Sequence, residues 1–420
     1  MIKIEHPELD KIAEEYFDFI KETITDRAKI FKMILEQILN QRDNLDELAK
    51  KNWGTIKSFT KLLFKNKINL LKADELNGEK ERRQELENKL KQGKKKDWVN
   101  DDVLQLCQSL SNEDKVKRII LASASDKDVN CFVIEVNNSF NLTKDKDNPT
   151  KDKESHLLIN KIIDYDILKN TVPNEKTEKL IAYWLTERLN VNTCPYCNRS
   201  PIQTVFDNSA NQKGLIRPTL DHFYPKAKYP FLALSFYNLI PSCYFCNSSL
   251  KGGEKDEDKD KDNEGKKNKV IITPKTHLNP YIDGFGDDAK FSFEFTEVQS
   301  QKSHPDNYKI ILDSNKQKQV DKEKQRQIFG DNPNEGNVNI FKLEKIYQVH
   351  RDLVGELVVK AEVFKAQQEN IRQFYQALST NDSELYQFYF GNYLDEKDHN
   401  KRPLAKLTKD IVTEIIPNHF

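Results

Sequence analysis

Four cysteines in two Cys-x-x-Cys pairs carry the clearest chemistry in this sequence. Cys194 and Cys197 form the first pair, and Cys243 and Cys246 form the second. A tight turn directs both sulfurs of a pair to one side, so the two pairs can supply the four thiolates of a tetrahedral structural zinc site. Two unrelated pairs, one of them redox-active, are the alternative, but paired spacing of this kind is typical of zinc. Disulfides are disfavoured, since we find no signal peptide and cytosolic thiols stay reduced.

Oxygen and imidazole donors lie between and beside the two cysteine pairs. They are Asp221, His222, Asn238 and Asn247. A free imidazole titrates near neutral pH and can accept a proton from water. Carboxylate and amide oxygens are ligands for hard ions such as magnesium or manganese. The set can therefore support metal-assisted attack on a phosphodiester. A structural role for His222 and a turn role for Asn238 are the alternatives.

Three elements must position these residues. Leu215–Phe223 is predicted to be a strand that ends at the Asp-His step, and the apolar run Phe231–Phe236 leads into a loop at Asn238. Cys246–Lys251 has the pattern of the start of a helix, which the two following glycines would stop. A segment this short buries little apolar surface, so a bound metal would supply stability that its core cannot.

The order Cys-x-x-Cys, Asp-His-x-x-Pro, Asn-Leu, Cys-x-x-Cys-Asn-x-x-x-Lys runs from Cys194 to Lys251. It resembles the HNH endonucleases, the ββα-metal or His-Me finger family, and in particular the branch with a four-cysteine zinc treble clef. The run Tyr-Pro-Phe-Leu-Ala-Leu before Asn238 is similar to HNH proteins of bacterial antiphage systems such as the Septu type, in which the nuclease works beside an ATPase. The resemblance implies an endonuclease that hydrolyses DNA in antiphage defence, with structural zinc and a catalytic magnesium or manganese ion.

The resemblance also implies a role for each matching residue. His222 would be the general base, Asp221 a metal ligand, and Asn238 the residue that braces the loop and orients the imidazole. Asn247 would be the second metal ligand, at a position where the family often has histidine. The expected products are a 5′ phosphate and a 3′ hydroxyl. The candidates for phosphate contacts are Lys251 and Arg199.

The charge composition limits how the chain would meet nucleic acid. Its 420 residues include 67 Lys and Arg and 67 Asp and Glu, so the formal net charge is zero. Because phosphate contacts dominate nucleic-acid affinity, we expect either local positive charge or a partner subunit, such as an ATPase, that delivers DNA. The basic run Lys89–Lys96 is more typical of a solvated helix end. No stretch has the length of a membrane span, and the absence of a targeting signal predicts a cytoplasmic protein.

Two other functions stay open at this point. The finger can be a non-catalytic zinc-finger subunit that binds DNA or a partner in a defence complex, or the chain can be an RNA-directed nuclease. The sequence has no phosphate-binding glycine loop, so we do not expect the chain to be its own ATPase.

We predict an α+β fold that is mostly α-helical, with the zinc-anchored ββα-metal (HNH) finger at its centre. Residues 1–175 are predicted to be a helical N-terminal region, and 176–286 the HNH nuclease domain with a disordered loop at 254–269. Residues 287–420 are predicted to be a β-pair followed by a helical cap. The strands expected outside the finger are Cys131–Val136, Ala289–Val298 and Tyr308–Leu312.

Several other side chains are interpreted as structural. Cys107 and Cys131 are expected to be small core residues. His277 is expected to be a turn residue, with an approach to the active site as the alternative. A C-terminal aromatic cluster is expected to pack in the core rather than stack on bases. Its members are Tyr386, Phe388, Tyr389 and Phe390.

Overall fold

The computed structural model of the chain has an α+β fold that is mostly helical, as predicted. The structure describes residues 1–40, 45–66, 69–123, 129–132, 134, 149–173, 178–207, 213–251, 272–314, 321–376, 381–417 and 419–420. The predicted loop at 254–269 lies outside these residues. Within the described ranges, no helix is long and apolar enough to cross a membrane.

The chain divides into two compact units. We call the first the knuckle unit, which consists of Met1–Leu9, Lys176–Phe223 and Ile240–Phe420. We call the second the helical unit, which consists of Asp10–Glu175 and Tyr224–Leu239. The predicted three-region division rests on composition rather than on contacts, and it stays a prediction.

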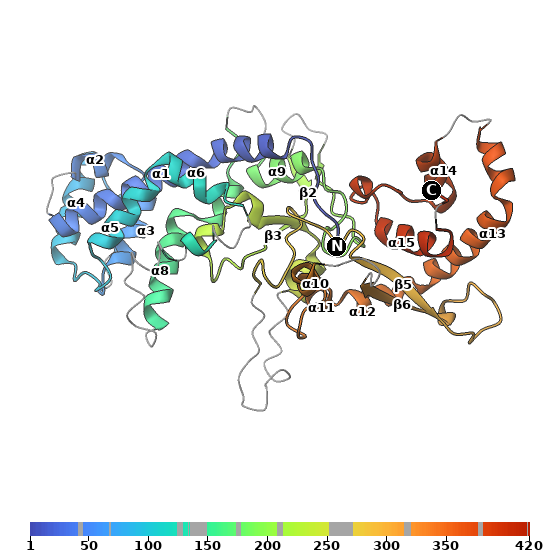
Figure 1. Cartoon of the computed structure of the whole chain (residues 1–420). Helices are drawn as coiled ribbons and strands as arrows, with labels where there is room; N and C mark the ends of the chain where they lie inside the picture. Colours follow the sequence, from blue (N-terminus) through green and yellow to red (C-terminus); the bar gives the residue numbers. More distant parts are fainter. Residues whose placement is uncertain are drawn as a thin grey trace. The chain divides into compact units, whose positions relative to one another are not determined.

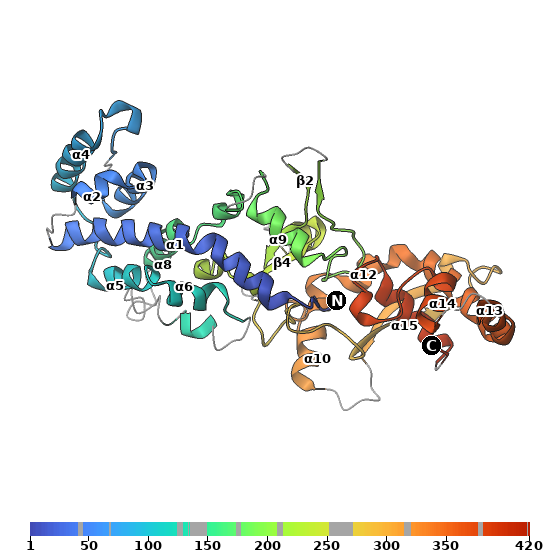
Figure 2. The same cartoon turned by 90° about the horizontal axis from the view of Figure 1, so that it is seen from above.

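The helical unit is built along the long helix α1 (Leu9–Asn40), with α2, α3 and α4 gathered near its C-terminal part (Figure 2). Apolar residues at helical spacing along α1 are buried, and Phe31 meets Phe59 of α3 with ring centroids 4.6 Å apart. Asparagine side chains cap α3, α5 and α6, because each accepts a backbone N–H of the first turn. The remaining elements are α2 (Leu45–Lys50), α3 (Trp53–Leu63), η1 (Ala73–Glu75), α4 (Glu79–Gln92), α5 (Asp101–Leu110), α6 (Glu113–Ile120), α8 (Pro149–Ile162) and η3 (Tyr165–Lys169).

The segment Tyr224–Leu239 belongs to the helical unit although it lies between the two cysteine pairs in sequence. It forms two short 3-10 helices, η4 (Pro230–Leu232) and η5 (Phe236–Asn238), and η4 contacts α6 and α8. The hydroxyl of Tyr16 donates to the carbonyl of Leu234 over 2.9 Å. The apolar run predicted from Phe231 to Phe236 therefore packs as core of the helical unit.

In the knuckle unit, β5 (Ala289–Phe295) and β6 (Tyr308–Ser314) form an antiparallel pair (Figure 1). Phe291 opposes Leu312, and both are buried, which is the alternation of a strand pair covered on one face. Helices α13 (Arg351–Gln376) and α15 (Ala405–Ile415) contact this pair and each other. The predicted β-pair is thus confirmed.

The other elements of the knuckle unit are short. They are α9 (Ile181–Leu189), β1 (Val205–Phe206), β2 (Gly214–Ile216), β3 (Thr219–His222), β4 (Leu239–Ser242), the π-helix η6 (Phe245–Leu250), η7 (Pro305–Asn307), α10 (Lys322–Phe329), α11 (Asn337–Ile340), α12 (Leu343–Tyr347), η8 (Gln348–His350), α14 (Asp382–Phe390) and η9 (Glu396–Asp398).

Some local predictions were wrong. The strand expected at Cys131–Val136 is helical at Cys131 and Phe132, and Cys131 is exposed rather than core. The single strand expected at Leu215–Phe223 is divided into β2 and β3, because Pro218 lies between them and cannot donate to a ladder. Phe388 is exposed, so it is not a core aromatic. Cys107 is buried as expected, and so are Tyr386 and Phe390.

Candidate metal centre and the Asp221–His222 site

The four predicted zinc ligands form one buried cluster. The sulfurs of Cys194, Cys197, Cys243 and Cys246 all lie within 4.8 Å of one another, and none is in a disulfide. A cluster of this kind matches the donor set of a structural zinc ion, which is four-coordinate and prefers thiolates. The residues present therefore fit a metal such as zinc.

The first cysteine pair lies on a tight turn of the backbone. The amide of Cys194 donates to the carbonyl of Ser200 over 2.9 Å, and the amide of Asn198 donates to the carbonyl of Cys194 over 2.7 Å. Asn198 has a positive φ of 47°, a conformation that asparagine tolerates better than most residues. Its side chain also donates to the carbonyl of His399 and accepts from the amide of Lys406. The turn is thereby fixed to the C-terminal part of the knuckle unit.

The second cysteine pair joins a strand to a helix. Cys243 directly follows β4, and Cys246 lies in the first turn of the π-helix η6. The amide of Cys246 donates to Cys243 Sγ, with 3.4 Å between nitrogen and sulfur. Hydrogen bonds from Cys194 lower the pKa of Cys197 to about 7, and they also lower the pKa of Cys243. Burial raises the pKa of Cys194, and hydrogen bonds to the other cluster thiols raise that of Cys246. Cys197 and Cys243 are thus the thiols that lose their protons most readily, whereas deprotonation of Cys194 and Cys246 would depend on the charge of a bound metal ion.

Strand β3 pairs with β4 and ends at the Asp-His step. The hydroxyl of Thr219, at the start of β3, donates to the carbonyl of Ser242, at the end of β4, over 2.8 Å. The first residue of one strand thus meets the last of the other, as in an antiparallel pair. The π-helix η6 follows β4 and contacts β3. Short π-helical turns are rare and often occur at functional sites.

Asp221 is a buried carboxylate held by two donors. The hydroxyl of Tyr196 donates to Asp221 Oδ2 over 2.7 Å, and Lys251 Nζ donates to the same oxygen over 2.6 Å. Lys251 also donates to the carbonyls of His222 over 2.5 Å and Phe223 over 3.2 Å. Burial lowers the pKa of Lys251, and the charge of Asp221 opposes this shift. Lys251 is thus directed to the carboxylate expected to bind metal.

Tyr196 is the site residue that sequence reasoning missed. It is the third residue of the first Cys-x-x-Cys pair, it is fully buried, and its ring stacks on Phe341 with centroids 4.3 Å apart. Because Tyr196 lies between two cluster cysteines and binds Asp221, it connects the cysteine cluster to β3. The signal available in the sequence was a hydroxyl-bearing residue inside the Cys-Pro-Tyr-Cys turn.

The remaining predicted residues lie in three places. His222 is half-buried at the end of β3, and Asn247 is half-buried in η6, so both are on contacting elements. Asn238 lies in the helical unit, where its amide accepts from the amide of Tyr224 over 2.6 Å and donates to the carbonyl of Leu232 over 2.9 Å. These bonds join the two ends of the segment 224–238. Arg199 Nε donates to His350 Nε2 over 3.0 Å.

Comparison with protein-family profiles, with curated proteins and with solved structures finds no match. The site must therefore be interpreted from its own residues.

His277 lies in the knuckle unit and is buried, with its Nδ1 atom 2.8 Å from Thr276 Oγ1. Its Nε2 atom has no hydrogen-bond partner among the described residues. Burial, reinforced by the charge of Lys251, lowers the pKa of His277 to about 4. The imidazole is therefore neutral at physiological pH, and the ammonium of Lys251 acts on it electrostatically.

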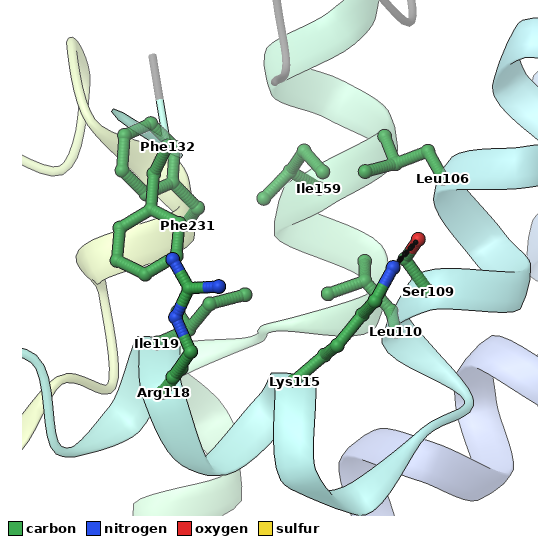
Figure 3. Close-up of a pocket in the computed structure, with 9 residues that line it drawn as sticks. All are labelled: Leu106, Ser109, Leu110, Lys115, Arg118, Ile119, Phe132, Ile159 and Phe231. Atoms are coloured by element: carbon green, nitrogen blue, oxygen red, sulfur yellow. Dashed lines mark hydrogen bonds between the residues drawn. The ribbon is translucent and has the colours of Figure 1, made fainter. Parts of the chain in front are cut away.

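A separate apolar cavity of about 290 Å³ lies in the helical unit (Figure 3). Phe132 and Phe231 form one side of it, and Arg118 lies over the Phe132 ring at 5.7 Å. Lys115 reaches across to Ser109, with 2.8 Å between Nζ and Oγ. None of the predicted site residues lines this cavity.

Proposed function

We propose that this protein is a metal-dependent endonuclease of the HNH type that hydrolyses phosphodiester bonds in DNA. The observation that carries the proposal is the anchoring of Asp221, the neighbour of His222 on β3, to the turn of a four-cysteine cluster through Tyr196. Strand β3, strand β4 and the helix η6 follow one another in the ββα order, with Asn247 on the helix. These features support the resemblance that the motif order suggested.

His222 is the proposed general base. The residue is half-buried at the end of β3, and an imidazole can take a proton from water near neutral pH. Tyr196 and Lys251 hold the neighbouring carboxylate in place. Asn238 fixes the backbone of Tyr224, which follows two residues after His222. A base must lie within hydrogen-bonding reach of the water it activates, so the support of Asp221, its neighbour on β3, matters for the rate.

Asp221 and Asn247 are the proposed holders of a magnesium or manganese ion. Their oxygens, and the carbonyls that face Lys251 Nζ, are hard donors that suit either ion. Such an ion would supply positive charge to the phosphate as negative charge develops on it. The structural zinc proposed in the cysteine cluster has a different task, which is to keep the turn that carries Tyr196 in position against β3.

The wider setting is also a proposal. A formal net charge of zero supports a substrate delivered by a partner rather than strong binding to bulk DNA. In a Septu-type antiphage system this partner would be an ATPase in the cytoplasm. Arg199 is a weaker candidate for a phosphate contact than the motif order suggested, because its Nε is directed to His350.

Incubating the zinc-loaded chain with plasmid tests the proposal. We expect cleavage with manganese or magnesium, loss of cleavage after a chelator that leaves the zinc in place, and recovery on adding manganese back. A chain that binds plasmid but leaves it intact under all these conditions would instead be a binding subunit. A transfer RNA substrate in parallel separates an RNA-directed nuclease, which would cut the RNA and spare the plasmid.

A further inference from the structure

The cation position beside Asp221 is filled by a side chain of the protein itself. Lys251 Nζ lies within hydrogen-bonding distance of the carboxylate Oδ2 of Asp221 and of the carbonyl oxygens of His222 and Phe223. One carboxylate and two backbone carbonyls are the hard oxygen donors that proteins use for divalent ions of this class. The ammonium therefore brings to Asp221 the positive charge that a metal ion would otherwise bring.

An ammonium and a divalent ion cannot share this carboxylate without strong repulsion. The side chains of Lys251 and Asp221 are only 9% and 5% exposed, so little water is present to screen one positive charge from the other. A metal ion on Asp221 thus requires the ammonium to move away.

The two partners of Asp221 differ in how easily they can leave. Tyr196 is fixed by burial and by its stacking on Phe341. Lys251 lies just beyond the last residue of η6 and carries its charge on a flexible four-carbon chain. The carboxylate can therefore keep its position through Tyr196 while the ammonium departs.

We propose that Lys251 is the resident counter-ion of Asp221, that a divalent metal ion binds by exchange with it, and that a phosphate of the nucleic acid accepts the displaced ammonium. This inference rests on the proposed function. It couples the two ligands, since a phosphate that draws Lys251 away makes the carboxylate available to metal, and metal that displaces Lys251 frees it for phosphate. By linkage, each ligand raises the affinity for the other by the same factor.

Manganese binding to the zinc-loaded protein without nucleic acid tests the exchange directly. The amount of free manganese would be measured by electron paramagnetic resonance for wild type, Lys251→Met and Lys251→Arg. We expect Lys251→Met to bind manganese at least about tenfold more tightly than wild type, or about 1.4 kcal/mol. Lys251→Arg keeps the positive charge and is expected to bind as weakly as wild type. Equal affinities for Lys251→Met and wild type would overturn the proposal.

Two controls keep this test decisive. Zinc content and circular dichroism show whether Lys251→Met is folded, and if it is not, Lys251→Gln replaces it in the same measurement. Adding Asp221→Asn to the Lys251→Met chain should abolish the tighter manganese binding. Tight binding that survives in the double variant would show that the ion lies elsewhere and would refute the exchange.

A second arm adds a DNA duplex to proteins that carry His222→Ala, which prevents turnover. The duplex should tighten manganese binding when Lys251 is present and should have a much smaller effect in the Lys251→Met background. The outcomes of the two proposals remain distinct. Tighter manganese binding by Lys251→Met in a chain that cuts no nucleic acid would support the exchange and contradict the nuclease. If the chain is a metal-dependent nuclease and Lys251→Met binds manganese only as tightly as wild type, the result would support the nuclease and contradict the exchange.

Discussion

The contribution of the hydrogen bond between Tyr196 and Asp221 can be tested with the variant Tyr196→Phe, which removes only the hydroxyl. That hydroxyl donates to Asp221 Oδ2 over 2.7 Å, and the two residues are 0% and 4% exposed. A hydrogen bond to a charged group typically stabilises a protein by about 1.5–3 kcal/mol. The ring can keep its stacking on Phe341, so we expect the free energy of unfolding of the knuckle unit to fall by about 2 kcal/mol.

Urea denaturation can be monitored through the release of zinc to a chromogenic chelator, and this signal reports on the knuckle unit selectively. Tyr386→Phe is the matched control in the same unit. Tyr386 is also 0% exposed, but its hydroxyl has no hydrogen-bond partner among the described residues. Removing that hydroxyl breaks no bond, so we expect little change in the free energy of unfolding. If Tyr196→Phe and Tyr386→Phe have the same free energy of unfolding, the reasoning about Tyr196 is wrong.

Tyr196→Phe should also affect the chemistry that we propose. Partners that orient a metal ligand typically contribute 10–100-fold to metal affinity or activity. We therefore expect cleavage by Tyr196→Phe to fall by at least about tenfold while its zinc content stays that of wild type. Unchanged cleavage would mean that the hydroxyl does not position Asp221.

Two further predictions concern the metal centre and pH. Cys243→Ser should lose zinc and destabilise the knuckle unit, because structural zinc contributes about 10–16 kcal/mol of apparent binding energy in zinc-finger peptides. Cys131→Ser, a change at an exposed thiol outside the cluster, should keep its zinc, and elemental analysis of both variants checks this. Burial lowers the pKa of His399 to about 4, whereas its pKa in the unfolded chain is about 6.5. Between these two values the unfolded state binds more protons than the folded state, so the free energy of unfolding falls as the pH decreases through this window. His399→Gln should therefore lose about 2 kcal/mol less stability than wild type between pH 7 and pH 5, and an equal loss in urea titrations at both pH values would contradict this.

The cysteine cluster could be predicted from the sequence because its chemistry is encoded in spacing. Two Cys-x-x-Cys pairs have few alternatives to a shared metal, and the four sulfurs do lie together. The β-pair was also predictable, since Phe291, Phe293 and Phe295 alternate along β5 with the period of a strand. In the β-pair the signal is local, and in the cluster each Cys-x-x-Cys pair is local, while the demand of zinc for four ligands predicts that the two distant pairs meet.

The partners of Asp221 depend on contacts between residues far apart in sequence. Tyr196 and Lys251 meet the same carboxylate from the first cysteine turn and from the end of η6. The spacing of residues around Asp221 gives no information on either contact, so Lys251 was expected to meet phosphate. The strand predicted at Cys131–Val136 is helical at its described residues, 131, 132 and 134, because a short run of β-branched and apolar residues does not by itself distinguish a strand from a helix.

Cleavage of plasmid by His222→Ala tests the central claim most directly. The comparison is with wild type and with His304→Ala. His304 caps the start of η7 in the same unit, and its ring accepts from the amide of Asp306. All three proteins should contain zinc. We predict metal-dependent cleavage by wild type and His304→Ala, and a rate at least about 100-fold lower for His222→Ala, as expected on loss of a general base. Cleavage by His222→Ala at the wild-type rate would contradict the account.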